Sequence, residues 1–185
     1  MPRVTLRPLS EKDCDARWVR WLNDPAVSQW LASRGKIRWT LPRLHRWFRA
    51  HARRPGTRIY GIMVGRRRVG TLKIKGLGSE RWASVGLMIG ERRWRGRGVG
   101  AAAIHEAVTV AERVGNLGVW AGMRSDNYAS FWAFSKAAFG LACDDQCSGD
   151  EFAHPADVFE GRKAGERRVF LRLKVVVPLA RKVLR

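Results

Sequence analysis

The stretch "VGLMIGERRWRGRGVGAAAI", residues 85–104, decides the fold of this chain. It reads as a buried strand, then a turn with four arginines and three glycines, then the start of an alanine-rich helix. Glycine is a poor helix former and neighbouring arginines repel one another, so the turn carries a local cost. The N-terminus of a helix offers unpaired N–H groups and the positive end of the helix dipole. A bound anion would offset the arginine repulsion, and the sequence therefore predicts an anion-binding turn.

Two familiar phosphate-binding motifs do not fit this turn. The pattern G-x-x-x-x-G-K-[ST] is absent, which excludes a Walker P-loop. The glycines at 96, 98 and 100 are spaced G-x-G-x-G rather than G-x-G-x-x-G. The turn also follows strands that are joined mostly by hairpins, which argues against a dinucleotide-binding fingerprint. A purely structural tight turn is the remaining alternative.

Hydrophobic periodicity predicts an α/β fold around this stretch, with a central strand–helix–strand unit. We expect strands at residues 4–10, 58–64, 68–75, 82–90, 117–124 and 167–177. We expect helices from Ser10 to Asn23, from Thr40 onward, from Val99 to a cap at Gly115, and from Ser125–Asn127 to about Gly140, with a short helical piece after Pro25. At 185 residues the chain is expected to form a single domain.

The charge balance is strongly basic, with 36 lysines and arginines against 16 acidic residues and a formal net charge of +20. Such a balance favours an anionic partner. Because most of these basic residues are arginines, the composition of a GC-rich genome explains the charge equally well. No apolar run approaches the ~20 residues of a membrane span, and the N-terminus lacks a secretory signal. We therefore expect a cytoplasmic protein with no membrane span.

The motif "RGRGVG", residues 95–100, matches the pattern R/Q-x-x-G-x-G/A, and the chain thereby resembles the GNAT N-acetyltransferase superfamily. The stretch "AGMRSDNYASFWAFSKAAFG", residues 121–140, resembles the family's next strand and helix, whose pattern is N-x-x-A-x-x-x-Y-x-K-x-G-F. The N-terminal segment "LRPLSEKD…WLNDPAV" resembles its first strand and acceptor-side helix. The resemblance covers about residues 4–141. It implies the GNAT fold, a mixed and mostly antiparallel sheet of about six to seven strands flanked by helices.

The resemblance also implies acetyl-CoA as the co-substrate, with no metal. Backbone amides of the turn would hold its pyrophosphate, and backbone groups of the preceding strand would pair with its pantetheine arm. The implied cofactor-binding residues are Met88, Ile89, Arg95, Gly96, Arg97, Gly98, Val99, Gly100, Ala101, Asn127, Ser130 and Phe134. The implied layout is acceptor-side helices at about 10–54, an acetyl-CoA-binding core at about 82–140 and a C-terminal strand at about 167–177.

The catalytic residues stay unknown at this point, because the chain departs from the family pattern twice. Phe134 stands where the family often has a tyrosine that donates a proton, and Ser84 stands where many members carry a glutamate. Tyr128 and Glu91 are weak candidates for the missing groups. A packed surface aromatic and an ion pair with neighbouring arginines are the simpler explanations of these two residues.

The acceptor is expected to be a primary amine on a small molecule. The segment "WVRWLNDPAVSQWL", residues 18–31, is most similar to nucleotide-amino-sugar N-acetyltransferases, which makes Trp21, Asn23, Asp24 and Trp30 acceptor-side candidates. A structural explanation is equally good: the tryptophans would belong to the core, and Asn23 and Asp24 would end a helix. A ribosomal-protein or other peptide N-terminus is the alternative acceptor, and a non-catalytic CoA- or RNA-binding protein of the same fold is the alternative function. A homodimer is an assembly that the sequence leaves open.

Overall fold

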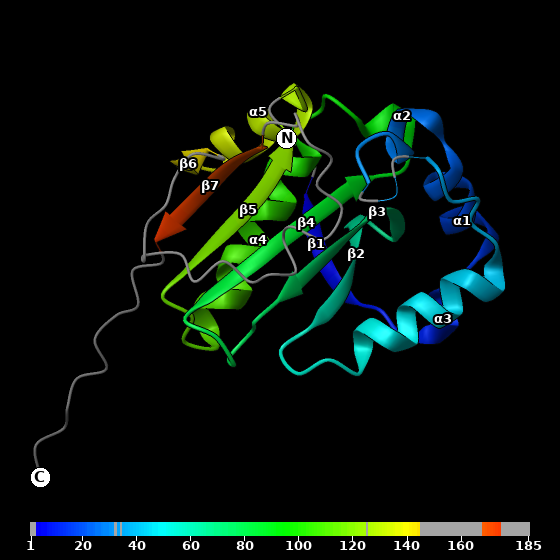
Figure 1. Cartoon of the computed structure of the whole chain (residues 1–185), viewed down its shortest axis with the longest axis horizontal. Helices are drawn as coiled ribbons and strands as arrows, with labels where there is room; N and C mark the ends of the chain where they lie inside the picture. The colour runs from blue at the N-terminus through cyan, green and yellow to red at the C-terminus, as the bar shows by residue number, and fades with distance from the viewer. Residues whose placement is uncertain (1–2, 32, 34, 125, 145–167, 175–185) are drawn as a thin grey trace, which may run out of the picture.

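A computed structural model of the chain describes residues 3–31, 33, 35–124, 126–144 and 168–174. A single sheet of seven strands crosses the molecule in the order β1-β2-β3-β4-β5-β7-β6 (Figure 1). The strands are β1 (Val4–Pro8), β2 (Arg58–Val64), β3 (Arg67–Lys75), β4 (Trp82–Ile89), β5 (Gly118–Arg124), β6 (Gly140–Asp144) and β7 (Arg168–Lys174). The β4–β5 pair is parallel and the other neighbours are antiparallel, so the sheet is mixed, as predicted.

Helices cover both faces of the sheet (Figure 1). They are α1 (Ala16–Asn23), α2 (Pro25–Ser28), α3 (Leu41–Ala52), α4 (Val99–Arg113) and α5 (Tyr128–Lys136), with short 3₁₀ turns at η1 (Glu11–Asp13) and η2 (Arg92–Trp94). Helices α4 and α5 pack on the larger apolar cluster, which includes Ile62 and Leu72. Helices α1 and α3 pack on a second cluster that includes Ile59. Because successive side chains of a strand alternate between faces, Ile59 and Ile62 of β2 belong to opposite faces.

The helix starts follow the capping residues of the sequence with one correction. We expected the first helix to begin at Ser10, but Ser10 and Asp13 bond to each other and open only η1. Helix α1 begins after Asp15, whose Oδ1 accepts the N–H of Trp18 at 2.8 Å. Aspartate is as good an N-cap as serine, and it stands where the buried stripe of α1 begins. Thr40 caps α3 as predicted.

The parallel pair β4–β5 separates along its length, and this separation positions the site. Three residue pairs join the strands, from Trp82↔Gly118 to Ser84↔Trp120. Beyond Ser84, β4 continues to Ile89 with a ladder partner only on β3, among the residues that the structure describes. One edge of the last five residues of β4 therefore keeps backbone groups that the sheet does not use.

A buried asparagine closes the other end of the β4–α4–β5 unit. Asn116 is 1% exposed and lies between α4 and β5. Its Nδ2 donates to the carbonyls of Gly76 and Glu80 at 2.9 and 2.8 Å, and its Oδ1 accepts the N–H of Gly78 at 3.2 Å. The asparagine thus fixes the β3–β4 loop to the α4–β5 junction. The sequence analysis missed it, because a single asparagine after a helix also reads as an ordinary turn.

The two C-terminal strands differ in how well the sequence predicted them. Strand β6 was not predicted. Strand β7 spans Arg168–Lys174, inside the expected range of 167–177, whose residues 167 and 175–177 lie outside the described residues.

In the described part of the chain, no helix is long and apolar enough to traverse a bilayer.

Candidate functional site

The N-terminus of α4 is an uncapped helix end. Its N-cap is Gly98, which has φ +77° and no side chain to accept a hydrogen bond. The first bond of the helix runs from the Ala102 N–H to the Gly98 carbonyl at 3.0 Å. The N–H groups of Val99, Gly100 and Ala101 precede that bond and have no partner within the helix. Three amides and the positive end of the dipole are therefore available to an anion.

The three glycines of the turn have different structural reasons. Gly96 has φ +73° and no atom within 4 Å of the place where a Cβ would stand, so its surroundings are open. Gly98 also adopts the left-handed conformation, which glycine reaches without steric cost. A Cβ on Gly100 would lie 3.5 Å from the Cβ of Ala133 in α5. The first two glycines shape the turn, whereas the third lies beside α5 with room for a methyl group.

The four arginines of the turn separate into two groups. Arg92, Arg93 and Arg97 are exposed around the helix end. Arg95 turns inward: its Nε donates to the Ile89 carbonyl at 2.9 Å, and its Nη2 donates to the Gly90 carbonyl and to Asp24 Oδ2, both at 2.8 Å. The structure therefore gives Arg95 three protein acceptors, whereas the resemblance placed it among the cofactor contacts.

The end of β4 presents Ile89 and Met88 differently. The Ile89 carbonyl meets Arg95 rather than β3. The N–H and C=O of one strand residue point to the same side, so the Ile89 N–H also faces away from β3. The Met88 carbonyl instead faces β3, where a side chain on Gly70 would collide with it. The unused edge of β4 is therefore formed by alternate residues that include Ile89.

Asn127 and Phe134, which we expected to contact acetyl-CoA, both have partners within the protein. Asn127 Oδ1 accepts the Ser130 N–H at 3.2 Å and caps the helix. Phe134 is 2% exposed, and its ring lies 5.0 Å from that of Phe139 in the main core. The structure thus gives Phe134 a packing role. Gly100 places the start of α4 beside Ala133, so Asn127 and α5 border the same region as the turn.

Two of the four acceptor-side candidates hold the protein together. Trp21 is 6% exposed, and a methyl group on Gly90 would overlap its ring. Trp21 therefore supports the chain immediately after β4. Asn23 forms two bonds with the backbone of Trp39, donating to its carbonyl at 2.9 Å and accepting its N–H at 2.8 Å. Both observations match the structural explanation that the sequence left open.

The other two candidates lie nearer to open solvent. Asp24 caps α2 by accepting the Ala26 N–H and pairs with Arg95. The Arg95 guanidinium holds the pKa of the Asp24 carboxyl below its ordinary value. Trp30 is 37% exposed, and the Arg124 guanidinium lies 5.7 Å from its ring centroid. Because Arg124 ends β5, Trp30 stands beside the strand that diverges from β4.

The two weak catalytic candidates have little support from their surroundings. Tyr128 is 68% exposed at the start of α5. Glu91 Oε2 lies 3.9 Å from Arg67 of β3, so its ion pair is with an arginine distant in sequence rather than with the neighbouring arginines that we expected.

Sequence reasoning missed Lys73, which lies on β3 directly opposite Gly86 of β4. Its Nζ is 5.3 Å from the ring centroid of Trp47, and it makes no ion pair with any described residue. Burial, reinforced by the nearby charges of Lys75 and Arg54, lowers the pKa of the Lys73 ammonium to about 8. Gly86 is exposed and has nothing within 4 Å of a Cβ position, so the space beside Lys73 is open. The alternating pattern of β3 was the available signal, since it puts a lysine on a covered face.

The sequence matches a known protein family, and its fold matches solved structures. The chain matches the family described as "Acetyltransferase (GNAT) domain" over residues 3–139. No curated protein matches the chain.

Several solved structures share the fold over nearly the whole chain. The aminoglycoside acetyltransferase AAC(6′)-Ib in complex with coenzyme A is 14% identical, with a TM-score of 0.72 over 93% of this chain and 95% of that one. Spermidine N-acetyltransferase from Vibrio cholerae, in complex with CoA and spermine, is 13% identical, with a TM-score of 0.72 over 94% and 96%. RimL, a ribosomal L7/L12 alpha-N-protein acetyltransferase in complex with coenzyme A, is 15% identical, with a TM-score of 0.74 over 95% and 96%. Such low identities establish the fold alone.

Proposed function

Because this chain belongs to the GNAT acetyltransferase domain family, we propose that it transfers the acetyl group of acetyl-CoA to a primary amine. The observation that carries the proposal is the uncapped end of α4 beside the unused edge of β4. Among the described residues, these are two adjacent sets of backbone groups that neither the helix nor the sheet uses, and only the Ile89 carbonyl on the β4 edge meets a side chain, that of Arg95. The same arrangement would not be needed in a purely structural turn.

The residues present fit acetyl-CoA. The N–H groups of Val99, Gly100 and Ala101 would hold the pyrophosphate, and Gly96 leaves room for its approach. Exposed Arg97 would add charge. The edge that includes Ile89 would pair with the amide-containing pantetheine arm, as one strand pairs with another. Acetyl-CoA supplies the activated acetyl group, and the protein supplies position and polarity.

We assign Arg95 a positioning role rather than direct phosphate binding. It accounts for the carbonyls of Ile89 and Gly90 and for the Asp24 carboxylate. It therefore connects the end of the donor strand to α2. This contact would fix the distance between the thioester and the acceptor-side helices.

We propose Lys73 as the group that accepts the proton released by the acceptor amine. Its open neighbour Gly86 leaves space for a water molecule between Lys73 and the exposed edge of β4. A lysine titrating near neutral pH is partly uncharged under working conditions, as a general base must be. Tyr128 is 68% exposed, and Glu91 already approaches Arg67.

The positive charge of the protein favours an anionic acceptor. In the described residues, Asp24 is already paired with Arg95, and the exposed ring at the diverging strands, Trp30, is covered by a cation, Arg124. A protein with a net charge of +20 repels polycationic amines. The proposed acceptor is therefore an amine on an anionic carrier, with a nucleotide-linked amino sugar as the first choice and Trp30 as its stacking surface. Residues 10–54 would form the acceptor side and residues 82–140 the donor side.

A panel of amines tests the proposal. CoA release is measured with acetyl-CoA and a uridine-diphosphate-linked 4-amino sugar, a peptide with a free N-terminus, kanamycin or spermidine. We expect the highest kcat/KM with the anionic amino sugar. Preference for the peptide would assign the chain to N-terminal acetylation, and preference for the polycations would overturn the charge argument. Binding of CoA without turnover of any amine would leave a binding protein of the same fold.

A further inference from the structure

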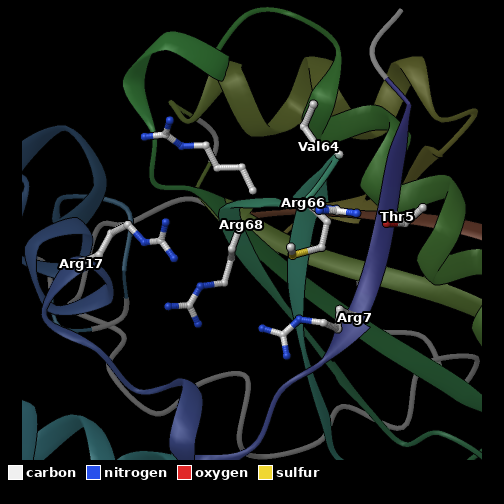
Figure 2. Close-up of a pocket in the computed structure, with 9 residues that line it drawn as sticks. Thr5, Arg7, Arg17, Val64, Arg66 and Arg68 are labelled. Atoms are coloured by element: carbon white, nitrogen blue, oxygen red, sulfur yellow. The ribbon is translucent and has the colours of Figure 1, made fainter.

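A second cationic site lies on the other side of Glu91 from the α4 turn, at the tip of the β2–β3 hairpin. A groove of about 790 Å³ opens there between β1, the hairpin and the start of α1. Five arginines line it: Arg7, Arg17, Arg66, Arg67 and Arg68. Figure 2 shows the guanidinium groups of Arg7, Arg17 and Arg68 directed toward one another from three different elements.

Two aspartates organise three of these arginines into one network. Arg7 bonds to Asp13 Oδ1 at 2.6 Å, and Arg68 donates to the Asp13 carbonyl at 2.9 Å. Arg68 also pairs with Asp15 Oδ2 at 2.7 Å, and Arg17 approaches the same oxygen at 3.6 Å. The arrangement fixes three guanidinium groups that would otherwise repel one another. Such preorganisation is typical of a binding site rather than of a solvated surface.

Arg68 is the buried centre of this network. Its side chain is 4% exposed, and its guanidinium lies 5.3 and 5.6 Å from the ring centroids of Trp18 and Trp21. The Nε–H of Arg68 is buried without a hydrogen-bond partner, and so is the Nε–H of Arg17. An unpaired buried donor is costly. These two Nε–H groups are enclosed by protein atoms, so a ligand in the groove would instead contact the terminal guanidinium nitrogens of the exposed arginines.

The groove also has an excess of positive charge. The acidic side chains that pair with its arginines are Asp13, Asp15 and Glu91, three carboxylates against five guanidinium groups. The closest approach of Arg67 to Glu91 is a long 3.9 Å. Exposed Arg66 makes no hydrogen bond or ion pair with any residue that the structure describes. The groove therefore carries two more guanidinium groups than carboxylates, and Arg66 is the one of the five without a partner among the described residues.

We infer that this groove binds a small phosphate-bearing anion, separately from the α4 turn. A phosphate group offers several acceptor oxygens and two negative charges, which match the excess positive charge and the exposed guanidinium groups of Arg66 and Arg67. The forked guanidinium groups suit such oxygens better than a single carboxylate would. The volume is in the range of small-molecule sites rather than of an extended nucleic-acid surface. The inference does not depend on the proposed acetyltransferase activity.

Calorimetric titration with inorganic pyrophosphate tests the inference. The titration is made at constant ionic strength with and without saturating CoA, so that the α4 turn can be occupied independently. The double variant Arg17→Gln/Arg66→Gln leaves the buried Arg68 in place. We expect it to lose about tenfold or more in pyrophosphate affinity, since two charge-assisted contacts disappear, while its affinity for CoA stays unchanged.

A matched variant controls for net charge. Arg46→Gln/Arg53→Gln removes two exposed arginines from α3 and its C-cap, neither of which lines the groove. We expect its pyrophosphate affinity to stay within about twofold of the original protein, because exposed charges that do not contact the ligand are screened by salt. Equal losses in both double variants, or no binding of millimolar pyrophosphate, would overturn the inference. A short RNA that binds through Arg17 and Arg66 more tightly than pyrophosphate does would assign the groove to nucleic acid and overturn the small-ligand assignment.

Discussion

Arg95 is the residue that joins the donor strand to the acceptor-side helices. One guanidinium accounts for two backbone carbonyls at the end of β4 and for the carboxylate of Asp24, 71 positions away in sequence. Arginine suits this position because its fixed fork reaches several acceptors at once. Lysine would reach one of them at a time.

The variant Arg95→Ala tests this connection. Loss of the guanidinium leaves the Ile89 and Gly90 carbonyls and Asp24 without their partner, so we expect a loss of about 1–3 kcal/mol in the free energy of unfolding. We also expect a drop of at least about tenfold in kcat/KM through displacement of the β4 end. Urea unfolding and steady-state kinetics measure the two effects. The neighbouring variant Arg97→Ala serves as the control, with weaker CoA binding and unchanged stability; equal behaviour of the two variants would contradict the assignment.

Lys73 makes stability depend on pH in a stated direction. Its pKa is about 8 in the folded protein and 10.5 in an ordinary environment, so between these values the unfolded chain holds a proton that the folded chain has lost. Lys73 therefore contributes a gain in stability of up to about 3 kcal/mol as pH increases from about 8 to 10.5, while the buried Cys14 thiol, whose pKa is raised from 9.0 to about 11, opposes it above about pH 9. The free energy of urea unfolding should accordingly rise more steeply with pH in the original protein and in Lys75→Met than in Lys73→Met.

The variant Lys73→Met also tests the proposal that Lys73 accepts the proton of the acceptor amine. The pH profile of kcat/KM should have an acidic limb near pH 8, because protonated Lys73 cannot accept a proton. Lys73→Met should lose most of its activity and that limb with it. A profile that keeps the limb in Lys73→Met would assign the proton transfer to another group.

Ala138 occupies a backbone conformation that favours glycine, at the position where the family pattern has glycine. Its φ is +65°, and it is exposed just after α5. The left-handed conformation costs an alanine roughly 1 kcal/mol relative to glycine. We expect Ala138→Gly to raise the free energy of unfolding by about 0.5–1 kcal/mol, measured by urea unfolding. Ala137→Gly, one residue earlier at a negative φ, should destabilise instead.

The start of α4 combines conformation and binding in neighbouring glycines, and this can be separated experimentally. Gly98→Ala forces an alanine into φ +77° beside the free amides, and we expect a loss of about 1–2 kcal/mol in stability and of about tenfold or more in CoA affinity. Gly100→Ala meets Ala133 at an ordinary contact distance inside the helix and should be nearly neutral in both. Thermal unfolding and calorimetry distinguish them. Equal CoA affinity in the two variants would mean that the helix end does not bind the pyrophosphate.

The elements that the sequence predicted well are those with a local cause. The turn before α4 was visible because its glycines and arginines are adjacent in sequence, and α3 because Thr40 precedes an amphipathic run. The first helix was placed too early because Ser10 and Asp15 are both competent caps, and tertiary packing chose the second. Strand β6 was missed because it forms an edge against β7 and has no turn signal of its own.

The residues of the candidate site were harder to assign than its elements. The contact of Arg95 with Asp24 and the position of Lys73 opposite Gly86 join segments that are distant in sequence. No periodicity encodes such pairs. Trp21 and Asn23 have the protein partners that their structural explanation requires, and these partners, Gly90 and Trp39, are distant in sequence.

The net charge of the whole protein should govern its encounter with the acceptor. Attraction between a protein of charge +20 and an anionic amine is screened by salt, so we expect kcat/KM for such an amine to fall several-fold between about 0.05 and 0.3 M salt. A neutral amine should show little change, and a polycation should show a rise. Steady-state rates with the three acceptors at several salt concentrations give the comparison. A salt-independent kcat/KM for the anionic amine would show that the charge has no part in its capture.

Asn116 limits how the gap between β4 and β5 can widen. The carboxamide fixes one end of these diverging strands, while at the opposite end Arg95 contacts Asp24 and Arg124 contacts Trp30. We therefore expect any widening to be a rotation about the asparagine end, with the largest displacement at Ile89 and Arg124. Amide hydrogen exchange should accordingly be faster at Met88 than at Ser84, two residues whose backbone groups face β3, and shortening Asn116 to alanine should reduce the difference.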